Sequence, residues 1–286
     1  MKYRLAYLMI SLALLCFENA LRAAEPMPIV CRTNIAHRGA SAIAPENTLA
    51  AFRQAITDGA SGCECDVYKS ADGVAILIHD KTTKRTLGGG DDDVTKLTFE
   101  ELRKRDAGVW KGEHFRNEKI PTLDEYLDLL RGTSCHPVIE IKMDGIEKTV
   151  LDAVRKRDML AETVIIAFSA NVVKEIRRLE PNICVGYLYS EKLEGNAGSH
   201  ADRLADILLR RSNELDTPIL SLNHTLLSEK LVRRLKEAGK HVWCWTVNDA
   251  ARMNTVLDWG VESVTTDKPD VLTDVLKQRM RSRADK

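Results

Sequence analysis

Short apolar runs alternate with amphipathic segments from residue 33 onward, and this alternation limits the fold more than any other feature of the chain. The apolar runs are bounded by polar or turn residues, which is typical of buried strands. The segments between them place apolar residues at helical spacing, as Leu49, Phe52 and Ile56 do. Strands that alternate with helices in this way predict a parallel sheet.

The predicted strands cover residues 33–37, 62–68, 138–142, 163–168, 183–189, 219–222, 241–247 and 263–266. A helix is predicted after each, over residues 47–58, 122–130, 147–157, 171–179, 201–211, 228–238, 250–259 and 270–278. Residues 74–79 form an extra hairpin arm after the second strand. Eight such units in about 250 residues predict a closed (β/α)8 TIM barrel. An open doubly wound sheet is the alternative, but it needs a phosphate loop of the form G-x-G-x-x-G, which this chain lacks.

Two local features refine this prediction. Residues 81–121, rich in Gly, Asp and Lys, are longer than an ordinary connection, so we expect an insertion over the barrel mouth or against its side. Thr122 with Glu125 three residues later predicts a capping box at the start of a helix. Asn47 suits the cap of the first helix, and an indirect role for Glu46 and Asn47 in orienting a site is the alternative.

Residues 1–24 have the order of a secretory signal peptide. Lys2 and Arg4 precede the apolar residues 5–17, and small residues follow at Ala23 and Ala24. The apolar run is shorter than the roughly 20 residues that a spanning helix needs. We therefore expect an exported protein, periplasmic or secreted, with a mature domain over residues 31–280 and no stable membrane insertion after cleavage. An uncleaved anchor is the alternative.

The net charge limits the kinds of partner that the protein is expected to bind. Lys plus Arg and Asp plus Glu each number 42, so the formal charge is zero, and nothing suggests a nucleic-acid surface. We expect a small-molecule substrate and no nucleic acid; the sequence does not reveal the oligomeric state.

Of the 7 cysteines, Cys16 lies in the predicted signal. Most others lie in strand-like runs, which favours buried thiols, although their even number permits disulfides.

Charged and titratable side chains gather at the ends of the predicted strands, where a barrel of this kind carries its reactive groups. They are His37, Arg38, Glu64, Asp66, His79, Glu140 and Lys142. Because successive strand residues point to opposite faces, Glu64 and Asp66 share one face and Cys63 and Cys65 the other. Three converging carboxylates would repel one another, and a hard divalent cation such as Ca²⁺ or Mg²⁺ relieves this with oxygen ligands. An ion-pair network with Arg38 and Lys142 is the alternative.

The chain resembles the glycerophosphodiester phosphodiesterase family over nearly all of its mature length. The motifs that carry the resemblance are His37-Arg38-Gly39, Pro45-Glu46-Asn47-Thr48, Glu64-x-Asp66, His79-Asp80, Ile120-Pro121-Thr122-Leu123, Glu140-x-Lys142, Trp245-Thr246-Val247-Asn248 and Thr266-Asp267. Each is weak alone, and together in this order they are highly specific. One departure is Phe168-Ser169, where many relatives have the serine before the aromatic residue.

The resemblance implies a (β/α)8 barrel with residues 81–121 as the family's insertion. It implies Glu64, Asp66 and Glu140 as ligands of one divalent metal ion, Ca²⁺ or Mg²⁺. His37 and His79 correspond to the general acid and base, and Arg38 and Lys142 to phosphate clamps. Trp245 is expected either to pack in the barrel or to form a wall against the substrate.

The implied reaction is hydrolysis of a glycerophosphodiester to glycerol 3-phosphate and an alcohol. One imidazole withdraws a proton from the attacking oxygen and the other protonates the leaving alkoxide. The attacker is either water or a neighbouring hydroxyl of the substrate. Two alternatives remain: a phospholipase D-like enzyme acting on lysophospholipids or sphingolipids, and a non-catalytic phosphate-ester binding protein. The second would not need two histidines.

Overall fold

Eight parallel strands close into a barrel in the computed structural model, which describes residues 33–193 and 200–284. These strands are β1 (Asn34–Ala36), β2 (Gly62–Lys69), β4 (His136–Ile141), β5 (Val164–Ala167), β6 (Cys184–Tyr189), β7 (Ile219–Asn223), β8 (His241–Trp245) and β9 (Ser263–Thr266). The first strand pairs with both β9 and β2, which closes the sheet. The predicted (β/α)8 fold is therefore confirmed. The predicted signal, residues 1–24, lies outside the described residues.

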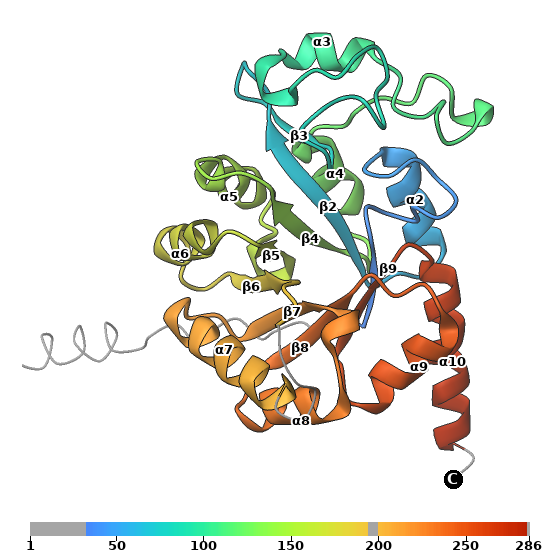
Figure 1. Cartoon of the computed structure of the whole chain (residues 1–286). Helices are drawn as coiled ribbons and strands as arrows, with labels where there is room; N and C mark the ends of the chain where they lie inside the picture. Colours follow the sequence, from blue (N-terminus) through green and yellow to red (C-terminus); the bar gives the residue numbers. More distant parts are fainter. Residues whose placement is uncertain (1–32, 194–199, 285–286) are drawn as a thin grey trace, which may run out of the picture.

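Helices surround the barrel (Figure 1). They are α2 (Leu49–Thr57), α4 (Leu123–Leu130), α5 (Glu147–Arg155), α6 (Ala170–Leu179), α7 (His200–Glu214), α8 (Glu229–Glu237), α9 (Ala250–Asp258) and α10 (Pro269–Ala284), with 3-10 turns η3 (Leu160–Glu162) and η5 (His224–Leu226) in connecting loops. Thr122 and Glu125 form the predicted capping box at α4. The prediction that Asn47 caps the first helix is wrong: Thr48 is the cap, and its side chain accepts from the backbone N–H of Ala51.

The strand pleat separates two apolar cores. The core between sheet and helices includes Cys63 and Cys65, whose thiols are free. A smaller core fills the barrel interior with Ile35, Val138, Val164, Ile166, Cys184, Leu188, Ile219 and Trp243. Because neighbouring residues of β2 face opposite sides, Glu64 and Asp66 point into the interior while the cysteines pack under the helices. The expected placement of the cysteines is confirmed for this pair.

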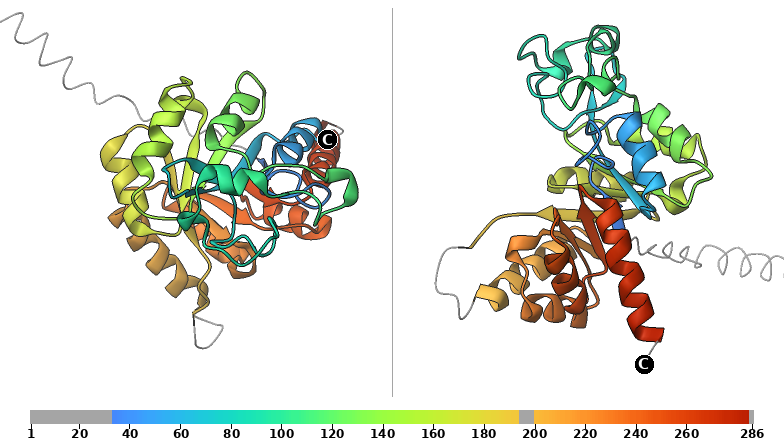
Figure 2. Two further views of the ribbon diagram at one scale, coloured as in Figure 1. Left: turned by 90° about the horizontal axis from the view of Figure 1, so that it is seen from above. Right: turned by 90° about the vertical axis from the view of Figure 1, so that its right-hand side faces the viewer.

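The predicted insertion after the second barrel strand is also present. The predicted hairpin arm is β3 (Ala75–Leu77), which pairs antiparallel with β2, and the insertion that follows it contains η1 (Val94–Lys96), α3 (Phe99–Lys104) and η2 (Glu113–Phe115). It has its own core of Tyr68, Ile76, Ile78, Leu87, Val94, Leu102, Ala107 and Ile120. Figures 1 and 2 show it as a lobe at one end of the barrel. Among the described residues, no helix has the length and apolar character to cross a bilayer.

A tight turn after β1 sets the position of the first site residues. Arg38 and Gly39 have φ values of 56° and 81°. A Cβ atom on Gly39 would lie 2.6 Å from the carbonyl carbon of Ala51, which is closer than a real contact permits. The backbone of α2 therefore packs directly on this glycine, and only glycine combines the left-handed conformation with the close approach.

We expect Gly39→Ala to lower the free energy of unfolding by more than Gly132→Ala, measured by urea denaturation. Gly132 has a similar φ of 78° but open space around it, so its substitution costs only the backbone term of about 1–2 kcal/mol. Gly39→Ala adds an overlap with helix backbone that no side-chain rotation relieves. Equal losses in the two variants would contradict this account of the turn.

Candidate active site

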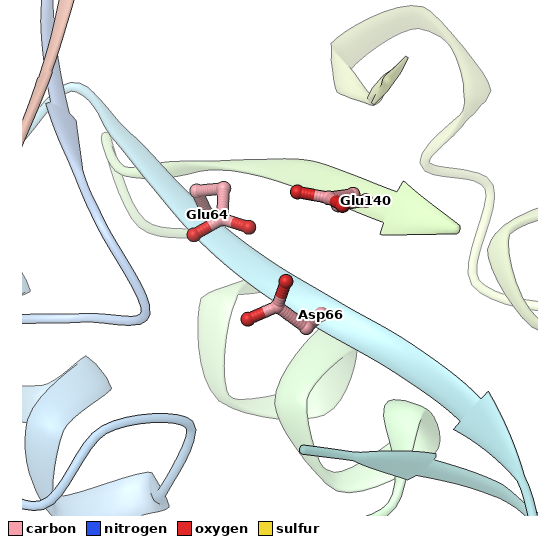
Figure 3. A group of neighbouring side chains, drawn as sticks. All are labelled: Glu64, Asp66 and Glu140. Atoms are coloured by element: carbon pink, nitrogen blue, oxygen red, sulfur yellow. The ribbon is translucent and has the colours of Figure 1, made fainter. Parts of the chain in front are cut away.

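Three carboxylates meet inside the barrel at neighbouring strands. Glu64 and Asp66 lie on β2 and Glu140 on β4, where Asp66 and Glu140 are register partners. One oxygen from each lies within 4.8 Å of the others (Figure 3). The three residues are 2%, 1% and 9% exposed. Buried like charges at this spacing repel strongly unless a cation or a proton compensates them.

Two side-chain cations partly balance this cluster. The ammonium group of Lys142 lies 2.7 Å from Glu140 Oε1 and 3.3 Å from Asp66 Oδ1. Arg38 Nε lies 3.2 Å from Asp66 Oδ2, and the Arg38 backbone N–H donates to Glu64 Oε2 at 2.8 Å. The ion-pair network and the carboxylate cluster considered from the sequence are therefore one arrangement.

The balance leaves the carboxylates in different protonation states. Burial, with the charges of Asp66 and Glu140, raises the pKa of Glu64 well above its ordinary value. Burial and Asp66 likewise raise the pKa of Glu140 to about 7. Burial would also raise the pKa of Asp66, but Lys142 and Arg38 outweigh it and hold that pKa below its usual range. If all three carboxylates were ionised, they would have one negative charge more than Arg38 and Lys142 neutralise, and the raised pKa values of Glu64 and Glu140 oppose that state.

The cluster fits a hard divalent cation. Glu64 Oε1 is buried and has no hydrogen-bond partner, although buried polar atoms are normally paired, and Asp66 Oδ1 has only an ion pair with Lys142 at 3.3 Å. Carboxylate oxygens are the ligands that Ca²⁺ and Mg²⁺ take. Glu64, Asp66 and Glu140 could therefore hold a metal ion.

Asn47 orients one of these carboxylates. Its side-chain N–H donates to Asp66 Oδ2 at 2.8 Å, and its carbonyl oxygen accepts from the Asp66 backbone N–H at 3.1 Å. Asn47 reaches strand β2 from a left-handed conformation with φ of 55°. The indirect orienting role considered for Asn47 from the sequence therefore matches its contacts.

His37 follows β1 and is held by Asp267, which follows β9. His37 Nδ1 lies 2.6 Å from Asp267 Oδ1, and Asp267 also accepts from Ser41 at 2.8 Å and Asn248 at 2.5 Å. Burial would raise the pKa of Asp267, but these donors, with His37 first, hold it well below its usual range. Because an ionised carboxylate only accepts, Nδ1 has the proton and Nε2 is the atom available for proton exchange.

His79 follows β3, and an aspartate holds it in the same way. Its Nδ1 lies 2.7 Å from Asp80 Oδ1, and Asp80 Oδ2 accepts from Arg85 Nε at 2.7 Å. The hydrogen bond from Arg85 is the largest influence on the pKa of Asp80. Burial opposes it and the hydrogen bond from His79 adds to it, and together they lower this pKa to about 2. Burial lowers the pKa of His79, opposed by the charge of Asp66 and assisted by the charges of Arg38 and Lys142.

One cavity of about 130 Å³ joins these groups. It is lined by His37, Arg38, Glu64, His79, Glu140, Lys142, Ile166, Phe168, Leu188, Ser221, Trp245 and Thr265. Trp245 forms part of the wall, with its indole N–H donating to the Ser221 carbonyl and its ring edge-on to Phe168 at 5.6 Å. The structure thus gathers the predicted site residues at one cavity, with Asp66 directly behind it. His224, which follows β7, accepts hydrogen bonds from Arg252 and does not line this cavity.

The roles of Asp267, Asn248 and Arg85 were not predicted from the sequence. Asp267 and Asn248 were singled out only as parts of motifs, although both follow strands and the strand-end rule could have found them. Arg85 lies in the insertion, and no sequence pattern indicates that it reaches Asp80. The site combines cationic side chains, a candidate metal cluster and two oriented imidazoles, which suits proton transfer at an anionic substrate.

Comparison with known proteins agrees with this geometry. The glycerophosphoryl diester phosphodiesterase family matches residues 37–271. The chain is 32% identical to the glycerophosphodiester phosphodiesterase of Caldanaerobacter subterraneus subsp. tengcongensis over 85% of this chain and 97% of that one. It is 29% identical to a Bacillus subtilis glycerophosphodiester phosphodiesterase over 85% and 86% of the two chains.

Solved structures show the same relationship. An Oleispira antarctica phosphodiesterase in complex with the product sn-glycerol-3-phosphate superposes with a TM-score of 0.76 at 28% identity, covering 86% of this chain and 96% of that one. The Agrobacterium tumefaciens glycerophosphodiester phosphodiesterase gives 0.71 at 27% identity, covering 84% and 98%. The chain therefore belongs to the glycerophosphoryl diester phosphodiesterase family, a family of phosphoric diester hydrolases.

Proposed function

We propose that the protein, a phosphoric diester hydrolase by its family, converts glycerophosphodiesters to sn-glycerol 3-phosphate and an alcohol. The observation that carries the proposal is the meeting of two aspartate-bound histidines and the carboxylate cluster at one cavity. The product bound in the Oleispira antarctica relative supports sn-glycerol 3-phosphate as the product here.

In the proposed mechanism Arg38 and Lys142 bind the phosphoryl oxygens. One imidazole takes a proton from the attacking oxygen as its bond to phosphorus forms. The other gives a proton to the alkoxide whose bond to phosphorus breaks, so the protons balance over the cycle. The attacker is water, or a substrate hydroxyl whose cyclic phosphate is then opened by water. Asp267 and Asp80 keep each Nδ1–H in place, so each Nε2 exchanges the proton.

Glu64, Asp66 and Glu140 would hold one divalent cation, Ca²⁺ or Mg²⁺, which supplies neutralisation of negative charge on the phosphoryl oxygens when bound. The buried Glu64 Oε1, which has no hydrogen-bond partner, supports this assignment. We further propose that the protein is exported, to the periplasm or the outside, on the basis of its signal-like residues 1–24.

Wild-type protein should release glycerol 3-phosphate from glycerophosphocholine, detected with glycerol-3-phosphate dehydrogenase, and should lose this activity in EDTA. His37→Ala and His79→Ala should each lower kcat by about 10²–10⁴-fold, the usual effect of removing a general acid or base. His241→Ala is the control, because His241 pairs with Glu262 away from the cavity. Activity confined to acylated substrates would instead identify the phospholipase D-like alternative.

Glu64→Gln and Asp66→Asn should abolish binding of Ca²⁺ or Mg²⁺ in isothermal titration calorimetry, because each removes a carboxylate from the cluster. Glu147→Gln should leave metal binding intact. Glu147 is also a buried glutamate, but it accepts from the Gly145 backbone N–H outside the cavity. Wild-type affinity in the two site variants would overturn the metal assignment.

A comparison of leaving groups should assign the two histidines. Replacing choline by p-nitrophenol, which leaves without protonation, should restore much of the lost rate in the variant that lacks the acid and little in the variant that lacks the base. The measurement is kcat of His37→Ala and His79→Ala on both substrates. Equal restoration in the two variants would contradict separate acid and base roles.

A further inference from the structure

We propose that Arg85, a residue of the insertion, is a positioning residue that fixes the orientation of the His79 imidazole through Asp80. The inference rests on the proposed function, because it concerns the same proton-transfer step. The insertion would thus contribute to that step, because one of its arginines binds both Asp80 and the barrel residue Glu46.

The contacts of Arg85 form a continuous chain of hydrogen bonds. Its Nε donates to Asp80 Oδ2 at 2.7 Å, and the other Asp80 oxygen meets His79 Nδ1 at 2.7 Å. Its two terminal nitrogens donate to the two oxygens of Glu46 at 2.6 and 2.8 Å. All three nitrogens of the guanidinium therefore donate to carboxylates, and both oxygens of Asp80 form hydrogen bonds.

Glu46 anchors this chain to the barrel. It lies in the turn between β1 and α2, and its side chain is 10% exposed. It also accepts from Arg38 at 2.9 Å. Arg38 contacts Asp66 in turn, so the anchor is continuous with the carboxylate cluster.

His79 and Asp80 need such an anchor because they follow the short strand β3 and lie outside the eight parallel strands of the described chain. Their side chains are 33% and 32% exposed, so packing alone does not fix their rotamers. A planar guanidinium that donates in fixed directions to two carboxylates limits the rotation of Asp80, and Asp80 limits that of the imidazole. Small displacements of a proton-transfer group lower the rate steeply.

Arg103 supplies a matched control within the same insertion. It forms a two-bond fork with Glu125 at 2.7 and 2.8 Å and is 35% exposed, against 42% for Arg85. Glu125 belongs to the capping box of α4 and does not line the cavity. Loss of either arginine removes a two-bond pair with a glutamate, but only Arg85 also bonds to an aspartate that holds a histidine of the site.

The first experiment compares the kinetics of Arg85→Ala and Arg103→Ala on glycerophosphocholine. Arg85→Ala should lower kcat by about 10-fold or more, as expected for a misplaced proton-transfer group, with a smaller change in KM. Added guanidinium should restore part of that loss. Arg103→Ala should keep wild-type kcat and show no response to guanidinium.

A double-mutant cycle tests whether the effect passes through His79. If Arg85 acts by placing this imidazole, Arg85→Ala should have little further effect in a His79→Ala background. An undiminished Arg85 effect in that background would overturn the inference. So would equal kcat losses in Arg85→Ala and Arg103→Ala, which would identify a general effect of a broken ion pair.

A readout without catalysis separates this inference from the proposed function. Ring ¹⁵N chemical shifts of His79, assigned by their absence in His79→Ala, should report an Nδ1–H imidazole in the wild type and a mixture of tautomers in Arg85→Ala. Absence of wild-type hydrolysis would overturn the proposed function while these spectra still decide the role of Arg85. Unchanged His79 shifts in Arg85→Ala would overturn the positioning role, whatever the activity.

Discussion

The site depends on the balance between the repulsion of three buried carboxylates and their attraction to two cationic side chains inside the barrel. Glu64, Asp66 and Glu140 would repel one another in this buried position, and Arg38 and Lys142 offset only part of that repulsion. Burial, together with this incomplete balance, raises the pKa values of the two glutamates, and Glu64 Oε1 has no hydrogen-bond partner. A divalent cation would complete it, and the same local positive charge would attract a phosphodiester that the neutral protein as a whole does not.

The two histidines are held by the same kind of contact. In each, Nδ1 bonds to an aspartate, which leaves Nε2 as the atom available for proton exchange. Their supports differ: Asp267 ends a barrel strand and is held by Asn248 and Ser41, whereas Asp80 precedes the insertion and is held by Arg85. The barrel therefore fixes one imidazole directly, and the insertion lobe contributes to fixing the other.

Most of the fold could be predicted from the sequence because local patterns determine it. The alternation of strands and helices specified the barrel, and the two-residue period of β2 placed Glu64 and Asp66 opposite Cys63 and Cys65. The cap of α2 was misassigned because Asn47 and Thr48 are both good capping residues, and only the tertiary contact of Asn47 with Asp66 distinguishes them. Arg85 could not be found, since its partners depend on how the insertion folds. The chemical roles of the histidines and carboxylates stay predictions.

The most direct test of this account is a crystal structure of the protein soaked with Ca²⁺ and sn-glycerol 3-phosphate. We expect anomalous density for one ion bound to oxygens of Glu64, Asp66 and Glu140, with the phosphate against Arg38 and Lys142 and an imidazole on either side of the phosphorus. An ion bound elsewhere, with Lys142 still on Glu140 and no phosphate between His37 and His79, would contradict it.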